Sequence, residues 1–347
     1  MASWKSWAET ATISAAALLA TLALFGGFVA LRGLRPLDVY AALFTGAFGS
    51  WFAIEETLTQ SAPLMLTALC TALPARAGLL VIGGEGALVV GGLATVLAGV
   101  LLVDAPAPLA VIAMGAAGAL AGGAWIGAAG ALRHRRGVNE TISTLLLNYI
   151  AIAVMNHLVT GPIRDYAQVL KPASWSIAEG FRIGDIPGTG IHWGLAVGVA
   201  AALLAYGLMR HTTFGFAVDI LGGNVRAARM AGLPIGRMIL TTCFMGGAAA
   251  GLAGTIEVAA VHGFASSSLA VGYGYTGILA AFLARQHPLA VAVVAILLGG
   301  ISASGGLLQR RFGLPDAATL VLRGLLFVAV LAASTLYGRG RVFRRAA

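Results

Sequence analysis

The sequence predicts an all-α polytopic membrane protein with about eight to ten transmembrane helices. Of the 347 residues, 59% are hydrophobic and only 10% are charged, whereas about 25% of the residues in a soluble domain are charged. Apolar runs of about 20 residues, the length that spans a bilayer as a helix, recur along the chain. The net charge of +9 comes from arginines in the short loops between these runs. This is the positive-inside pattern of a membrane protein and not a sign of nucleic-acid binding.

The candidate spans are distributed over the whole chain. They cover residues 11–31, 60–75, 79–103, 106–131, 141–160, 192–209, 238–261, 272–284, 288–308 and 317–336. The first run is expected to be an uncleaved anchor rather than a signal peptide. A further run at 39–53 is short and interrupted by glycines, and 272–284 is short for a full span, so one or two pieces are expected to be broken or re-entrant helices. No stretch resembles a separate soluble domain, so residues 1–347 are expected to form one transmembrane domain.

The charged loops predict which side of the membrane each connection faces. The segment RHRRG at 133–137 and the loop at 210–237, which holds Arg210, Arg226, Arg229 and Arg237 against Asp219, are rich in arginine. Both are expected on the cytoplasmic side. The loop at 161–191 has balanced charges and is expected to lie outside.

The residues that usually carry enzyme chemistry are scarce. The two lysines, Lys5 and Lys171, do not follow a glycine-rich phosphate-binding loop, so this chain is not expected to bind ATP in that way. No Ser/His/Asp arrangement or metal-ligand spacing stands out, so neither an enzyme nor a metal site is expected. Cys70 and Cys243 both lie in apolar runs and are expected to be small core residues.

An acidic residue among glycines is the first candidate for a functional site. Glu85 lies in LLVIGGEGALVVGG, residues 79–92, between Gly84 and Gly86. Glycines favour a helix break or close packing, and irregular backbone at membrane depth must be buried in protein or line a water-filled cavity. Glu85 is therefore expected either to be a structural carboxylate that satisfies freed N–H groups or to contact a substrate.

A second acidic residue, Glu257, also falls within a predicted span. Charged groups inside a membrane usually mark functional sites. However, Glu257 lies near the expected outer end of its helix, where solvation at the membrane interface is an equally good explanation.

The stretch GVNETISTLLLNYI at 137–150 is the second polar intrusion. Asn139 is a suitable N-cap, and Glu140 complements the helix dipole in the first turn. One helix face then carries Thr141, Thr144 and Asn148. Hydrogen bonding to another helix is the simpler explanation, and contact with a substrate is the alternative.

The third stretch is LGGNVRAARMAGLPIGR at 221–237, which predicts a short helix over about 225–231. This helix is too short to span a membrane. It is expected to be either a solvated connection or an element that docks in a cleft of a cytoplasmic partner.

Together these stretches resemble the permease subunits of bacterial ABC importers. The closest group serves nucleosides and simple sugars and is related to the ribose and branched-chain amino-acid permeases. The family pattern FNIGGEGQ resembles residues 80–87, although Val81 stands where the family has Asn and Ala87 where it has Gln. The stretch 137–150 with LVTGPIRD at 158–165 is similar to the nucleoside-type branch, and GYGYTGILAAFLA at 272–284 is similar to a late half-helix of the family. The resemblance covers about residues 37–335.

The resemblance implies a multi-pass permease domain of inverted-repeat architecture in the bacterial inner membrane. Its partners would be a periplasmic or lipoprotein solute-binding protein, a second permease chain (identical or a paralogue) and a cytoplasmic ABC ATPase. That ATPase would bind ATP and Mg, so no cofactor is expected in this chain. Residues expected along the substrate path are Gly84, Glu85, Gly86, Thr144, Asn148, Tyr149, Glu257, Tyr273 and Tyr275. Residues expected to couple to the ATPase are Asn224, Arg226, Ala227, Ala228, Arg229 and Gly232.

Two alternatives to nucleoside import stay open. The solute could be a simple sugar instead, because a binding protein sets much of the specificity and the tyrosines could simply be packing residues. The chain could also be a secondary transporter in which Glu85 couples uptake to protons or sodium. No ring of charges or filter sequence supports a passive channel.

Overall fold

The computed structural model describes residues 4–167, 171–315 and 317–334. The expected all-α class is confirmed over these residues, whose regular elements are helices, with isolated β-bridges in the loops. The chain divides into two compact units. The first comprises residues 1–57 and 300–347, and the second comprises residues 58–299.

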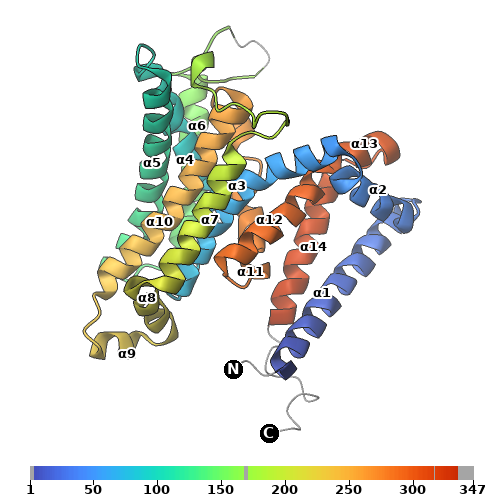
Figure 1. Cartoon of the computed structure of the whole chain (residues 1–347), viewed down its shortest axis with the longest axis horizontal. Helices are drawn as coiled ribbons and strands as arrows, with labels where there is room; N and C mark the ends of the chain where they lie inside the picture. The colour runs from blue at the N-terminus through green and yellow to red at the C-terminus, as the bar shows by residue number, and fades with distance from the viewer. Residues whose placement is uncertain (1–3, 168–170, 316, 335–347) are drawn as a thin grey trace. The chain divides into compact units, whose positions relative to one another are not determined.

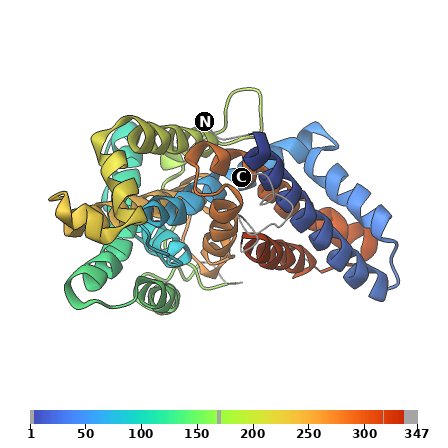
Figure 2. The ribbon, with the colours of Figure 1, turned by 90° about the horizontal axis from the view of Figure 1, so that it is seen from below.

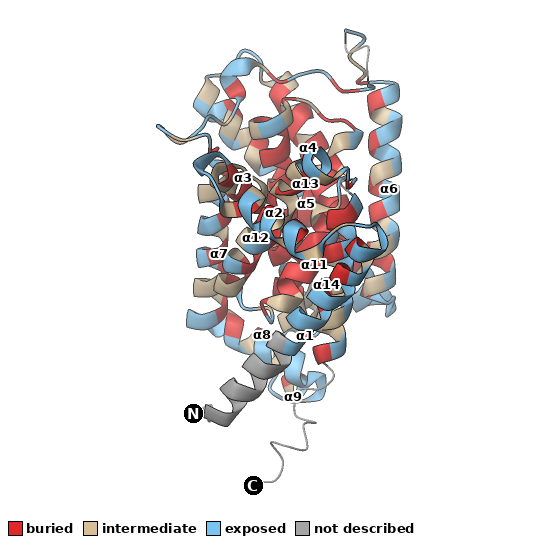
Figure 3. Ribbon diagram, turned by 90° about the vertical axis from the view of Figure 1, so that its right-hand side faces the viewer, coloured by how far each residue is buried: buried red, intermediate tan, exposed pale blue. Residues whose placement is uncertain are grey.

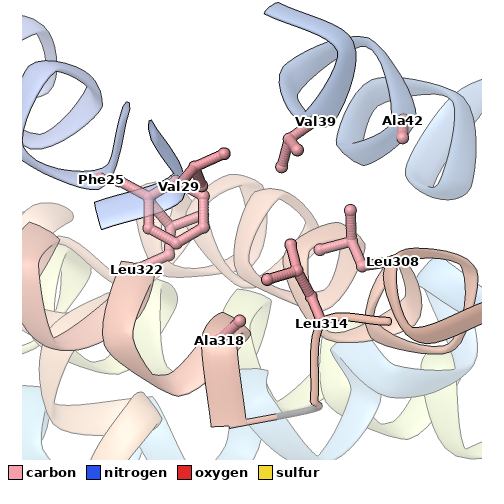
Figure 4. Packing of buried hydrophobic residues seen from close by; sticks show 8 residues of the cluster. All are labelled: Phe25, Val29, Val39, Ala42, Leu308, Leu314, Ala318 and Leu322. Atoms are coloured by element: carbon pink, nitrogen blue, oxygen red, sulfur yellow. The ribbon is translucent and has the colours of Figure 1, made fainter. Parts of the chain in front are cut away.

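The first unit is built on the two ends of the chain. It holds α1 (Trp4–Leu31), α2 (Pro36–Phe48), α13 (Gly305–Phe312) and α14 (Ala317–Ser334). Its core, drawn in Figure 4, consists of Phe25, Val29, Val39, Ala42, Leu308, Leu314, Ala318 and Leu322. Helices from opposite ends of the sequence thus share one apolar core.

A sharp bend separates α1 from α2. The apolar part of α1 and α2 meet at 114°, as a broken span or a re-entrant loop would. Gly33 has a φ of +75°, which other residues rarely adopt, and Pro36 begins the next helix, where its missing N–H costs nothing. The prediction that the piece after the first span is broken or re-entrant agrees with this geometry.

The second unit holds most of the apolar helices (Figure 1). They are α4 (Gly84–Leu101), α5 (Ala107–Arg136), α6 (Glu140–Thr160), α7 (Gly194–His211), α8 (Thr213–Gly223), α9 (Val225–Met230), α10 (Ile235–Ile256) and α11 (Tyr273–Leu283). Helices α3 (Trp51–Arg76) and α12 (Pro288–Ala303) have residues in both units. Helices α8 and α9 lie at one end of this unit, where α9 runs across the ends of the longer helices; Figure 2 views that end.

Helices α4, α5 and α10 pack closely because glycines line their contacts. A Cβ on Gly122 of α5 would lie only 2.7 Å from the Cα of Gly251 on α10, so the two backbones touch there. Small residues allow such close approach between membrane helices. Thr95 of α4 and Thr255 of α10 share a buried hydrogen bond of 2.8 Å beside this contact.

The described residues contain six helices that are long and apolar enough to cross a membrane, or seven if the bent α1–α2 pair counts as one span. The sequence predicted about eight to ten. The difference lies in three segments. Helix α3 carries polar residues through its first half, whereas α11 and the apolar part of α14 are shorter apolar helices.

Candidate functional site

The break predicted within 79–92 lies just before α4. Helix α3 ends at Arg76, the chain is not helical from 77 to 83, and α4 begins at Gly84. The backbone of 79–83, called the extended segment below, therefore has N–H and C=O groups without helical partners. Because these groups lie among membrane helices, they need partners from other side chains.

Polar side chains of α6 supply most of those partners. Helix α6 has a buried face that carries Glu140, Ser143, Thr144 and Asn148 and an exposed face opposite (Figure 3). The Leu80, Ile82 and Gly86 N–H groups donate to Glu140 Oε1 (3.3 Å), Thr144 Oγ1 (3.1 Å) and Asn148 Oδ1 (2.8 Å). Thr141 Oγ1, Asn148 Nδ2 and Thr71 Oγ1 of α3 donate to the carbonyls of Leu80 (2.9 Å), Ile82 (3.0 Å) and Val81 (3.1 Å). The polar face of α6 thus binds unwound backbone, whereas another helix was expected.

Glu85 joins α4, the helix that follows the break at 77–83, to the short helix α11. Its side chain is 1% exposed, and its two carboxylate oxygens accept hydrogen bonds from the Gly272 N–H (2.7 Å) and the Gly274 N–H (2.5 Å). These donors are at the start of α11, which has no side-chain cap of its own. A carboxylate at a helix N-terminus satisfies free N–H groups and complements the helix dipole. We call this contact the Glu85 clasp. Of the two roles left open by the sequence, this geometry is that of the structural carboxylate.

The clasp requires very close backbones. A Cβ on Gly274 would overlap the backbone nitrogen of Glu85. Thr67 Oγ1 of α3 donates to the Tyr273 carbonyl (3.1 Å), and the Tyr273 hydroxyl donates to Gln60 Oε1 (2.6 Å). Helix α3 therefore contacts the extended segment through Thr71 and the start of α11 through Thr67.

The predicted path residues fall into three groups. Gly84, Glu85, Gly86, Thr144 and Asn148 are buried together around the extended segment. Tyr149 and Tyr275 are 61% and 42% exposed within this chain, so neither ring is part of its packed core. Tyr273 lies between, half-buried against α3.

Glu257 is buried, so solvation at the membrane interface, one of its two expected explanations, does not fit the structure. Its side chain is only 3% exposed. It begins a π-helical turn, Glu257–His262, and its carboxylate lies 3.5 Å from His262 Nε2. The loop expected outside covers this turn, because the Ile183 N–H donates to the Ala259 carbonyl (2.9 Å) and the Ile177 N–H donates to the Gly263 carbonyl (2.9 Å).

Several residues of the site were not predicted from the sequence. Gln60, Thr67 and Thr71 lie on α3, and Arg133 lies 3.3 Å from Glu140. The four-residue spacing of Thr67 and Thr71 on an otherwise apolar run was the only local signal. It is weak, because threonine hydroxyls commonly bond to their own helix.

The predicted cytoplasmic helix is present as α9. The side chain of Asn224 caps it by accepting from the Arg226 and Ala227 N–H groups (2.9 and 3.2 Å). Ala228 is fully buried and packs within this chain. Arg226, Arg229 and Gly232 are exposed, and so is Met230, an apolar side chain that is 84% exposed.

Helix α9 lies next to the start of the extended segment. A pocket of about 320 Å³ is lined by Gly78 and Leu79 on one side and by Gly222, Val225 and Arg229 on the other. Arg76, the last residue of α3, forms a bidentate pair with Asp219 of α8. The α8–α9 region is thus attached to the end of α3 from which the extended segment begins.

This chain resembles known transport proteins along most of its length. The family described as "Branched-chain amino acid transport system / permease component" matches residues 53–331. The glucose ABC transporter permease protein TsgB13 of Haloferax volcanii is 32% identical over 94% of this chain and 88% of its own length. The guanosine ABC transporter permease protein NupP of Bacillus subtilis is 30% identical over 86% and 87%. The nucleoside ABC transporter permease protein NupB of Lactococcus lactis is 27% identical over 88% and 87%.

Proposed function

Because this chain belongs to the family of permease components of branched-chain amino acid transport systems, we propose that it forms the translocation path of an ATP-driven importer for nucleosides or similar small polar solutes. A permease component is not the subunit that hydrolyses ATP, so ATP and Mg would be bound by a partner ATPase. A solute-binding protein would deliver the solute to the outer face. A second permease chain, identical or a paralogue, would complete the path in the plasma membrane.

The observation that carries this proposal is the pocket that α9 shares with Leu79, the first residue of the extended segment. Met230 and Arg226 present an apolar group and a charged group outward on a short capped helix. These are the features of a docking helix. Val225 and Arg229 of α9 line the same pocket as Leu79, so a partner that shifts α9 would alter the surroundings of the start of the extended segment.

The hydrogen bonds then carry that shift into the membrane. The extended segment is bonded to four side chains of α6, those of Glu140, Thr141, Thr144 and Asn148. It leads through Gly84 into Glu85. Glu85 in turn holds the first turn of α11. A displacement of the extended segment would therefore reach α4 and α11, and interrupted helices of this kind form the substrate site in many transporters.

The exposed rings of Tyr149 and Tyr275 favour a solute with a flat or apolar face. A nucleobase stacks well on such rings, and two of the similar permeases are named for guanosine and nucleosides. Sugar is the second candidate because the relative at 32% identity is named for glucose. Uptake of labelled guanosine and labelled glucose by cells with and without this chain separates the two.

The coupling role is tested by Met230→Glu, which places a charge on an exposed apolar side chain without disturbing the core. Uptake should fall by at least tenfold while the amount of folded protein in the membrane is unchanged, and the ATPase should no longer co-purify. Val138→Glu, a similar change at an exposed residue of another loop, is the matched control and should leave both unchanged.

Normal uptake by the Met230→Glu protein would refute the docking role of α9. Uptake into vesicles without ATP, abolished by collapsing the ion gradient, would instead support a secondary transporter. The protein purified from its native membrane should also bring down an ATPase with a phosphate-binding loop, identified by mass spectrometry.

A further inference from the structure

A pocket of about 450 Å³ lies within the second unit, apart from the clasp and from α9. It is lined by Arg76, Tyr206, Arg210, Arg285, Gln286, His287 and Pro288. These residues come from the last turns of α3 and α7 and from the turn between α11 and α12. Three separate membrane segments therefore contribute to one polar hollow.

The pocket is strongly basic. Its lining holds three arginines and one histidine. Asp219 pairs with Arg76 and neutralises one of these charges. No aspartate or glutamate is among these lining residues, so the pocket favours an anion.

The turn that supplies half of the lining is held in an unusual conformation. Arg285 and Gln286 have φ angles of +50° and +61°, which non-glycine residues rarely adopt. Backbone hydrogen bonds from Arg285 to Phe282 (3.0 Å) and from Gln286 to Ala281 (2.8 Å) stabilise the turn. Tyr206 packs against His287 with ring centroids 5.5 Å apart, so the two sides of the pocket are in contact.

The surroundings of the pocket fit a lipid better than a protein. Arg210 follows Leu203 by seven residues on α7, so the two lie on one helix face, and Leu203 is 56% exposed. On α12, which begins at the pocket, Val293 and Leu297 are 61% and 52% exposed and one turn apart. Exposed apolar helix faces that end at arginines and a tyrosine have the character of a membrane interface.

We propose that this pocket binds the phosphate of an anionic lipid headgroup in the cytoplasmic leaflet, with the acyl chains along the exposed faces of α7 and α12. Basic pockets between membrane helices on the cytoplasmic side bind such headgroups. The proposal rests on the expected cytoplasmic location of 210–237, and it does not depend on which solute the chain carries.

The test is native mass spectrometry of the full chain in detergent, titrated separately with phosphatidylglycerol, phosphatidylcholine and inorganic phosphate. Arg210→Gln/Arg285→Gln removes two charges of the pocket. Arg135→Gln/Arg136→Gln is the control and removes two exposed charges at the end of α5. Each basic residue near an anionic lipid is worth about fivefold in affinity, so the pocket variant should bind phosphatidylglycerol about 25-fold more weakly. The control should bind as wild type does, and phosphatidylcholine binding should not change in either.

Three results would overturn the proposal. An equal loss of affinity for phosphatidylglycerol in the pocket variant and in the control would mean that only the overall charge of the protein matters. Displacement of phosphatidylglycerol by millimolar inorganic phosphate would identify a free-anion site instead of a lipid site. Unchanged lipid binding with loss of the co-purifying ATPase would identify a protein contact. Matching thermal unfolding of the two variants establishes that both are folded.

Discussion

Replacement of Glu85 separates the structural role of this residue from direct contact with the solute. Glu85→Ala removes both acceptors of the clasp, whereas Glu85→Gln keeps one oxygen and turns its NH₂ group toward the other N–H. In both variants at least one N–H at the start of α11 loses its partner. The Gly274 N–H is buried and Gly272 is half-buried, so water cannot replace both hydrogen bonds of the carboxylate.

The magnitude follows from the two hydrogen bonds. A hydrogen bond to a charged group contributes about 1.5–3 kcal/mol, so the two bonds of 2.7 and 2.5 Å contribute about 3–6 kcal/mol together. Removing the carboxylate also removes its own desolvation cost, which places Glu85→Ala near the lower end, at about 3 kcal/mol. For Glu85→Gln we expect about 2 kcal/mol, since one neutral bond of about 1 kcal/mol remains.

The assay combines unfolding with transport. The free energy of unfolding is measured by denaturant titration of the purified protein in detergent, with Glu179→Gln, an exposed acid in the loop expected outside, as the control. Both Glu85 variants should be destabilised by the amounts above, and the control by less than about 0.5 kcal/mol. The maximal rate of uptake should fall, because α4 and α11 lose the connection that Glu85 makes between them.

Unchanged stability of Glu85→Gln, with a raised KM for the solute, would refute the clasp as the main role of Glu85. Full uptake by Glu85→Gln with loss of stability would show that the clasp stabilises the fold without taking part in transport. In either case the carboxylate would not link α4 to α11 during the transport cycle.

Three further changes test other contacts of the site. Asn148→Leu removes two hydrogen bonds to the backbone around the extended segment. Because each unpaired group costs about 1–3 kcal/mol, the free energy of unfolding should fall by about 2–4 kcal/mol. Asn156→Leu, at an exposed residue of the same helix, is the control and should change this free energy little. Gly274→Ala overlaps the backbone of α4 and should abolish uptake and lower the thermal midpoint, whereas Gly306→Ala, which meets nothing within 4 Å, should do neither. Arg76→Gln breaks the pair with α8 and, because the arginine is only 23% exposed, should lower ATP-dependent uptake with a loss of stability of about 1 kcal/mol; uptake at the wild-type level would show that this pair does not hold the coupling region.

The predictions that succeeded depend on local sequence. Glycines around Glu85 disfavour a continuous helix, so the break near 79–92 could be predicted from that stretch alone. Asn224 and the Gly-Leu-Pro segment after Met230 set the ends of α9, because an Asn cap and a proline act within a few residues.

The partners of the polar groups could not be predicted from local sequence. Glu85 and its donor Gly272 are 187 residues apart, and no periodicity links them. The polar face of α6 was visible in the spacing of Thr144 and Asn148, but spacing does not reveal whether a helix or an extended backbone lies opposite. The burial of Glu257 depends on a distant loop, so its position near a helix end suggested solvation incorrectly.

The Glu85 clasp also constrains the order in which this chain can assemble during synthesis. The extended segment can be completed soon after α6 is made, since its partners on α6 lie 60–66 residues further along the chain. The carboxylate of Glu85 must wait for α11, whose first turn is made 187 residues later. Until then the Glu85 carboxylate lacks its partners on α11 in a medium where an unsatisfied polar group costs several kcal/mol. Folding of the second unit should therefore remain incomplete until its last helices are inserted, and a chain truncated before α11 should be recognised by membrane quality control.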